Sequence, residues 1–131
     1  MLLVPIPITR TFIRANRDWT FVYSTNVYHT SSYGQASQAS DEPNTIGVPV
    51  RFRFCKSNMS SYFSDDQFVD ILRPKLDAVF DKIRAAGTNV VVFPKIGEGA
   101  SRLKELAPRT FQYIRDNLAE LHNKSVTFVW Q

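Results

Sequence analysis

The fold of this chain is decided by one stretch of sequence, Val90-Val91-Val92-Phe93-Pro94-Lys95-Ile96-Gly97-Glu98-Gly99-Ala100-Ser101-Arg102-Leu103. Its first four residues are apolar and three of them are β-branched, which predicts a buried strand. The proline that follows ends the strand, because proline has no N–H to donate to a neighbouring strand. Two glycines then occupy alternate positions, and a helix pattern begins near Pro108. The stretch therefore predicts a strand, a glycine-containing loop and a helix.

Many α/β proteins hold a phosphate in such a loop, because backbone N–H groups turn toward the anion and glycine lets the backbone come close. This makes Gly97, Glu98, Gly99 and Ala100 a candidate ligand-binding segment. Two glycines one residue apart make neither a dinucleotide fingerprint nor a P-loop, and a tight turn leading into a helix explains the same residues. The carboxylate of Glu98 repels an anion, so it must point away from any phosphate in this loop.

The composition of the whole chain limits its class. A length of 131 residues predicts a single domain, residues 1–131, that is large enough to bury a core. No apolar run approaches the ~20 residues of a membrane-spanning helix, and the apolar N-terminus lacks the basic region of a signal peptide. The single cysteine, Cys55, excludes a disulfide framework and a cysteine metal cluster. We therefore expect a cytoplasmic protein with no membrane partner, metal or cofactor.

The charge of the chain suits an anionic partner. The net charge is +4 and the pI lies near 9.4, which favours a nucleotide or a nucleic acid. The excess is small and spread along the sequence, and small basic domains are common, so charge alone does not select the partner.

Hydrophobic periodicity predicts the secondary structure. The expected strands lie near residues 19–24, 48–54, 89–93 and 125–130, and the expected helices near 65–86 and 108–122. Residues 9–14 are read as an edge strand, since the prolines before them argue against a central one. A short helix is expected at 35–39, inside a long polar stretch.

The first long helix carries clear boundary signals. Ser64 and Gln67 predict a capping box at its start, Pro74 predicts a kink or a division, and Gly87 predicts its end. The apolar positions that repeat at three and four predict a stripe facing the core. They are Phe68, Ile71, Leu72, Leu76, Val79, Phe80 and Ile83.

The strand near 48–54 alternates apolar and basic residues. Val50, Phe52 and Phe54 are expected to face the core, and Arg51 and Arg53 the opposite side. That side is either a solvated polar surface or, if it borders a cleft, a source of anion ligands.

Together these elements predict an α/β fold, a two-layer or three-layer sandwich with a mixed β-sheet and flanking helices. Ligands in such folds lie beyond the carboxyl ends of the strands. The loops after Ser24 and after Phe93 begin at such ends, so we expect them to share one binding site.

Six short motifs occur along the chain in a fixed order. They are Tyr23-Ser24-Thr25-Asn26, Tyr33-Gly34-Gln35-Ala36, Pro43-Asn44-Thr45-Ile46-Gly47-Val48-Pro49, Tyr62-Phe63-Ser64-Asp65, the glycine loop from Pro94 to Leu103, and Leu106-Ala107-Pro108. In this order and spacing the chain resembles the macro-domain-like proteins, in particular a small macro-like family encoded by bacteriophages. The resemblance covers about residues 20–121.

The resemblance implies a macro-like fold that binds an ADP-ribose-like nucleotide. It carries ligand-binding roles to Asn26, Gly34, Gln35 and Arg51, and to the loop residues 97–100. Three positions depart from the family pattern. Thr25 stands where the family has an acidic residue, Val50-Arg51 replaces Thr-Lys, and Glu98 occupies a position that is often small or hydroxylated.

Several polar residues have two interpretations each. Asn26 either orients a ribose or a water or is a turn residue, and Gln35 either contacts ligand or caps its short helix. His29 is either a general base or a solvated loop residue. The adjacent carboxylates Asp41 and Glu42 are either an acid–base or metal pair or a polar turn before a proline.

The leading hypothesis is a bacteriophage macro-like domain, located in the host cytoplasm, that binds a nucleotide such as an ADP-ribose derivative without strong catalysis. One alternative is a phage accessory protein that binds a host protein or nucleic acid through a diverged macro scaffold. Another is an ADP-ribosyl hydrolase, although the sequence shows no credible acid–base pair, so no catalytic residue is assigned.

Overall fold

A computed structural model describes residues 2–3, 8–27, 34–52, 61–93, 101–122 and 126–129. Its strands are β1 (Leu2–Leu3), β2 (Thr20–Asn26), β3 (Thr45–Arg51), β4 (Val90–Phe93) and β5 (Val126–Val129). Its α-helices are α1 (Arg10–Ala15), α2 (Gly34–Ala39), α3 (Arg73–Ala86), α4 (Leu103–Leu106) and α5 (Pro108–His122). The four strands and two long helices expected from the sequence are confirmed, as is the short helix α2.

The strands form one sheet in the order β1-β5-β4-β2-β3. All four pairings between these strands are parallel, whereas the sequence predicted a mixed sheet. The antiparallel pairing that the structure describes is an isolated bridge between Arg51 and Tyr62. The reason lies in the connections, since a helix separates β2 from β3, β3 from β4 and β4 from β5, and such crossovers return the chain in the same direction.

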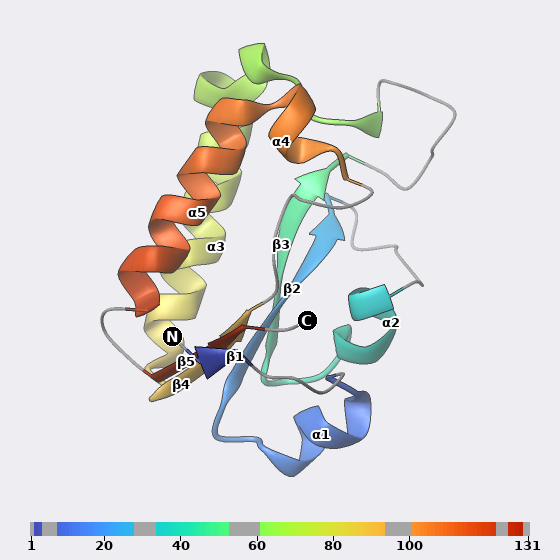
Figure 1. Cartoon of the computed structure of the whole chain (residues 1–131), viewed down its shortest axis with the longest axis vertical. Coiled ribbons are helices and arrows are strands. Elements are labelled where there is room, and N and C mark those ends of the chain that lie inside the picture. Colours follow the sequence, from blue (N-terminus) through green and yellow to red (C-terminus); the bar gives the residue numbers. More distant parts are fainter. Residues whose placement is uncertain are drawn as a thin grey trace.

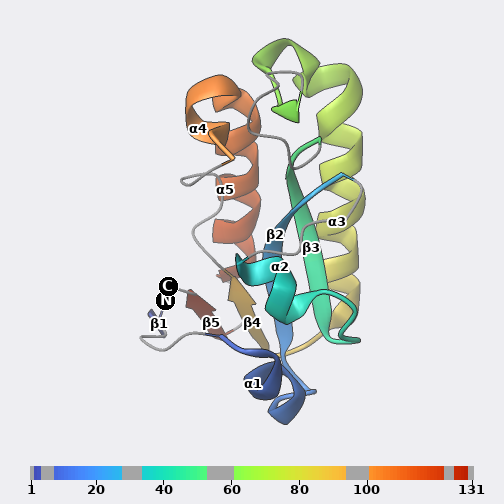
Figure 2. The ribbon, with the colours of Figure 1, turned by 90° about the vertical axis from the view of Figure 1, so that its right-hand side faces the viewer.

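Helices cover both faces of the sheet. The long helices α3 and α5 lie side by side on one face, and the short helices α1 and α2 lie on the other (Figures 1 and 2). Successive residues along a strand point to opposite faces of the sheet. Val22 and Val91 belong to the cluster that contains α3 and α5, while Phe21 and Val92 belong to the cluster around α1 and α2. The apolar run Val90–Phe93 therefore reflects burial on both faces.

The segment predicted as an edge strand at residues 9–14 is instead helix α1. Thr9 caps it, because its Oγ1 accepts a hydrogen bond from the N–H of Phe12 at 3.2 Å. Ile13 is fully buried while Arg14 and Ala15 are both exposed, which breaks the period of two that a strand would show. The edge-strand prediction was wrong because the local capping signal and the helical spacing of the arginines outweigh the β-branched residues.

The helical region after Ser64 begins and divides as the sequence indicates. The N–H of Ser64 donates to Oε1 of Gln67 at 3.0 Å, as a capping box requires. A 3₁₀ turn (Asp65–Gln67) and a π-helical turn (Phe68–Leu72) precede α3, which starts around Pro74. Gly87 ends α3 in the left-handed conformation, with φ of 63°.

The π-helical turn changes which residues of this region are buried. Leu72, Leu76, Phe80 and Ile83 are buried as predicted, but Ile71 is 42% exposed and does not belong to the stripe. A π-helix has more residues per turn than an α-helix, so Ile71, three residues after the buried Phe68, turns away from the core, while Leu72, four residues after it, stays buried. The prediction for Ile71 assumed α-helical geometry from the first turn onward.

Candidate functional site

The carboxyl ends of β2 and β3 carry two buried polar residues. Asn26 ends β2 and pairs with Arg51 at the end of β3, after a register shift between Thr25 and Asn26. Asn26 is 1% exposed and Arg51 is 7% exposed. The backbone N–H of Val27 donates to the carbonyl oxygen of Arg51 at 3.0 Å, which holds the two strand ends together. The parallel sheet thus brings two of the sequence-predicted ligand residues side by side.

The solvated interpretation of Arg51 is wrong. Helices cover both faces of this sheet, so the face opposite Val50 is also buried. Arg51 lies on that face and is therefore shielded from water, although it alternates with apolar residues along the strand. The burial of Arg51 is determined by the strands and helices that pack around β3, and not by the alternation of residues within β3. Arg53 and Phe54 lie outside the described residues.

Tyr62 joins two guanidinium groups at this end of the sheet. The guanidinium carbons of Arg51 and Arg102 each lie 5.6 Å from the centre of the Tyr62 ring. Tyr62 is buried, and the N–H of Phe52 donates to the carbonyl oxygen of Ser61 at 2.7 Å, which ties this segment to the end of β3. We call Asn26, Arg51, Tyr62 and Arg102 the carboxyl-end cluster. Helix α4, which follows Arg102, lies near the carboxyl ends of β2 and β3 (Figure 1).

Arg102 is held in an unusual backbone conformation. It precedes α4 with φ of 53° and ψ of 26°, the left-handed region that a non-glycine residue seldom adopts. Its guanidinium grips Glu105 through two bonds, Nη2 to Oε1 at 2.7 Å and Nε to Oε2 at 3.2 Å. The hydrogen bond from Arg102 lowers the pKa of Glu105 below its ordinary value, and the attraction of the two charges lowers it further. The pair is therefore ionised near neutral pH.

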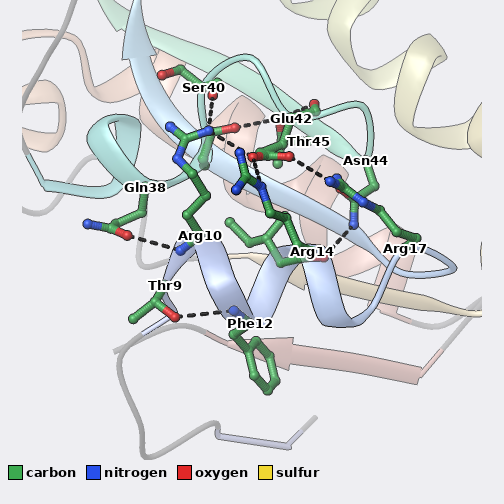
Figure 3. Close-up of polar contacts among 12 residues, drawn as sticks. Thr9, Arg10, Phe12, Arg14, Arg17, Gln38, Ser40, Glu42, Asn44 and Thr45 are labelled. Carbon is green, nitrogen blue, oxygen red and sulfur yellow. Dashed lines mark hydrogen bonds and ion pairs between the residues drawn. The ribbon is translucent and has the colours of Figure 1, made fainter.

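A second polar cluster lies at the opposite end of β3, and we call it the Glu42 clamp. Three arginines of α1 and its following turn reach one buried carboxylate (Figure 3). Arg10 and Arg14 contact Oε1 of Glu42 at 2.9 and 2.7 Å, and Arg17 contacts Oε2 at 2.9 Å. The Glu42 side chain is 3% exposed.

The three arginines determine the protonation state of Glu42. Burial of the carboxyl group raises its pKa, but the hydrogen bonds from Arg10, Arg17 and Arg14 together lower it more, from 4.5 to about 2. Such a carboxylate stays ionised at neutral pH and is a weak base, so it does not suit acid–base catalysis. The turn predicted at Glu42 is present, since the N–H of Thr45 donates to the carbonyl oxygen of Glu42 at 3.3 Å, but the Glu42 side chain is buried rather than solvated.

Further hydrogen bonds around the Glu42 clamp connect α1 to the chain that follows α2. Nδ2 of Asn44 donates to the carbonyl oxygens of Ile13 and Asn16 at 3.1 and 3.0 Å, and Arg17 donates to Oδ1 of Asn44 at 2.8 Å. Arg10 also donates to the carbonyl oxygen of Ser40 at 2.9 Å. These bonds fasten α1 to the segment between α2 and β3 (Figure 3). The clamp thus holds the layer of short helices to the sheet.

The remaining predicted site residues are described less fully. Gly34 and Gln35 begin α2, which packs against β2. Gly97, Glu98, Gly99 and Ala100 lie outside the described residues, as does His29. Of the predicted site residues, the structure therefore places Asn26 beside Arg51 on neighbouring strands. The role of the glycine loop stays a prediction.

Sequence reasoning missed the residues that complete both clusters. Arg10, Arg14 and Arg17 are spaced by four and three, which is the signal of one helical face, and the edge-strand prediction for residues 9–14 is incompatible with that signal. Arg102 and Tyr62 have no comparable signal. They are far apart in sequence, and only the folded chain brings both of them to Arg51.

Two classes of feature are absent from the described part of the chain. Within residues 8–27, 34–52, 61–93 and 101–122, no group of three His, Cys, Asp or Glu side chains is placed to hold a metal ion. None of the helices found in those ranges is long and apolar enough to cross a membrane.

Fold and site define an α/β protein whose parallel sheet is covered by helices on both faces and ends in a buried Asn–Arg pair. The model of a family of unknown function, DUF7831, matches residues 6–117, and the chain belongs to this family. No curated protein and no solved structure matches the chain.

Proposed function

We propose that the carboxyl-end cluster binds the phosphate groups of a nucleotide, and that the ligand is an ADP-ribose derivative. One observation carries the proposal: two guanidinium groups, from Arg51 and Arg102, converge on one ring at the carboxyl end of a parallel sheet. Ligands of open α/β sheets bind at this end. Guanidinium groups bind phosphate with two parallel charge-assisted hydrogen bonds, which suits them to this role.

The distribution of charge along the chain supports an anionic ligand here. Between Glu42 and Asp65 the sequence contains three basic residues and no acidic one. They are Arg51, Arg53 and Lys56, at the end of β3 or shortly after it in sequence. Three of the four net positive charges therefore fall in this one segment, so the excess is less evenly spread than expected; the segment includes Arg51 of the carboxyl-end cluster, and its charge would attract an anion.

The choice of ADP-ribose among nucleotides rests on the resemblance to macro-domain-like proteins. The ordered motifs that carry it include Asn26, and Arg51 stands just after the third motif, at a position where the family has a lysine; the sheet pairs these two residues. We extend the proposal to the fold, as a macro-like arrangement of the α/β layers, and to a phage origin. We further propose binding without strong catalysis, because Glu105, the carboxylate bound to Arg102, is engaged by that arginine and Glu42 belongs to the clamp.

Calorimetric titration of the full chain with ADP-ribose tests the proposal. We expect saturable heat, and we expect Arg102→Gln to weaken binding roughly 10-fold or more, since a hydrogen bond to a charged group contributes about 1.5–3 kcal/mol. Lys82→Gln on the exposed side of α3 is the matched control, because it removes the same charge far from the cluster in sequence. The absence of heat at millimolar ADP-ribose would refute the proposal.

A second variant separates the contribution of the buried arginine. Arg51→Gln should weaken ADP-ribose binding at least as strongly as Arg102→Gln, because Arg51 is 7% exposed and its side chain is more rigidly held. Circular dichroism and the urea midpoint of the variant show whether it folds. A folded Arg51→Gln protein with wild-type affinity would remove Arg51 from the site.

A further inference from the structure

We infer that Glu105 is an internal competitor of the ligand, a carboxylate that occupies the anion-binding edge of Arg102 until a phosphate displaces it. The inference rests on the proposed function, because it concerns the same cluster. It adds a residue that neither the motifs nor the family description assigns to the site.

The geometry of the Arg102–Glu105 pair resembles that of a bound anion. The two carboxylate oxygens face Nη2 and Nε of the guanidinium, at 2.7 and 3.2 Å. This is the same two-point arrangement in which arginine binds a phosphate. A phosphate that uses this edge must therefore replace Glu105, since one edge of a guanidinium cannot hold both anions.

Replacement of Glu105 by a phosphate costs little free energy, because the Arg102–Glu105 ion pair is exposed to solvent. The Arg102 side chain is 40% exposed and the Glu105 side chain is 64% exposed. Exposed ion pairs contribute little to stability, since water and salt screen them. Arg102 is also fixed by the ring of Tyr62, so its guanidinium stays at the cluster when Glu105 leaves.

The backbone of Arg102 provides an independent reason to assign it a function. A left-handed φ of 53° is strained for arginine, and a glycine at this position would remove the strain. Residues in such conformations concentrate at ligand-binding sites, where the surrounding structure holds them. Two non-glycine residues of the described chain have a positive φ, Asp41 and Arg102, and Arg102 is the one that stacks on Tyr62 next to Arg51.

Glu105 would then make the site selective. A ligand must interact with Arg102 more strongly than a carboxylate that is already tethered beside it. Carboxylate-bearing metabolites carry the same chemistry as Glu105 and gain little from the exchange, whereas a phosphate brings more acceptor oxygens. We therefore expect phosphate-containing ligands to bind and simple dicarboxylates to be excluded.

The test compares Glu105→Gln with wild type in calorimetric titrations with ADP-ribose and with inorganic pyrophosphate. Removal of the competing charge should tighten binding of both by about two- to five-fold, the range expected for an exposed ion pair. Glu120→Gln, a matched change at another exposed position, controls for the general gain in positive charge.

A double variant shows whether the effect passes through Arg102. In the Arg102→Gln background, Glu105→Gln should change affinity no more than Glu120→Gln does, because no guanidinium remains to be released. If wild type binds and Glu105→Gln leaves the affinity unchanged or weakens it, the inference fails and the proposed function stands. If neither protein binds either ligand, both are overturned.

Discussion

Replacement of Leu76 by alanine is the most direct test of how the helical layer packs on the sheet. Leu76 is 1% exposed and belongs to the core cluster that joins β2, β3 and β4 to α3 and α5. Its helical neighbours Leu72 and Phe80 are equally buried, so the surroundings have little freedom to close over the vacated volume. Truncation of a buried leucine costs about 2–5 kcal/mol, and a rigid site places Leu76→Ala at about 3 kcal/mol or above.

Ile71 provides the matched comparison in the same helical region. It is 42% exposed, so Ile71→Ala removes little buried surface, and alanine has the better helix propensity. We expect a loss below about 1 kcal/mol. The comparison is sharp because the periodicity of the sequence assigns both residues to one stripe, whereas the π-helical turn separates them.

Equilibrium urea unfolding, followed by circular dichroism, measures both changes. With a slope of about 1.5 kcal/mol per molar urea, a loss of about 3 kcal/mol lowers the midpoint by about 2 M. The Ile71→Ala midpoint should fall by less than about 0.7 M. Equal losses in the two variants, or a loss below about 1 kcal/mol in Leu76→Ala, would show that the helix presents a different face to the sheet.

Three further predictions concern the Glu42 clamp and two glycines. Because the pKa of Glu42 is lowered from 4.5 to about 2, its charged form stabilises the fold above pH 4.5, and this contribution is lost as the pH falls toward 2. Glu42→Gln should therefore lower the urea midpoint at pH 7, with the difference from wild type closing between pH 4.5 and 2; a constant difference would contradict this. Gly47→Ala should cost about 1–3 kcal/mol in urea unfolding, because the added Cβ would lie 2.8 Å from Cγ2 of Thr25. Wild-type stability of this variant would show that β2 and β3 move apart enough to relieve the contact, and would contradict the prediction. At Gly87 the added Cβ meets only Ala85 O at 3.9 Å, so Gly87→Ala should cost about 1–2 kcal/mol through its φ of 63° alone, and Gly87→Asn should cost less by the same measurement.

Much of the local structure follows from the sequence alone. The β-branched run at residues 90–93, the capping signals at Ser64 and Gln67, and the stop at Gly87 all act over a few residues. Their physical causes are local as well: side-chain shape, a reciprocal hydrogen bond and the steric freedom of glycine. Local rules placed Asn26 just after one strand and Arg51 within another; in the structure both residues end their strands, and the parallel pairing makes those ends neighbours.

Only the tertiary structure determines which charged side chains are buried and which partners they contact. Glu42 reads as a turn residue beside a proline, and it is buried because three arginines from another element neutralise it. Arg51 reads as a solvated residue, and it is buried because the sheet has no open face and Tyr62 packs against it. Burial of a charge depends on the partners that the fold delivers, since desolvation is unfavourable unless opposite charges, hydrogen bonds or an aromatic ring offset it. Those partners are distant in sequence, so no local pattern predicts them.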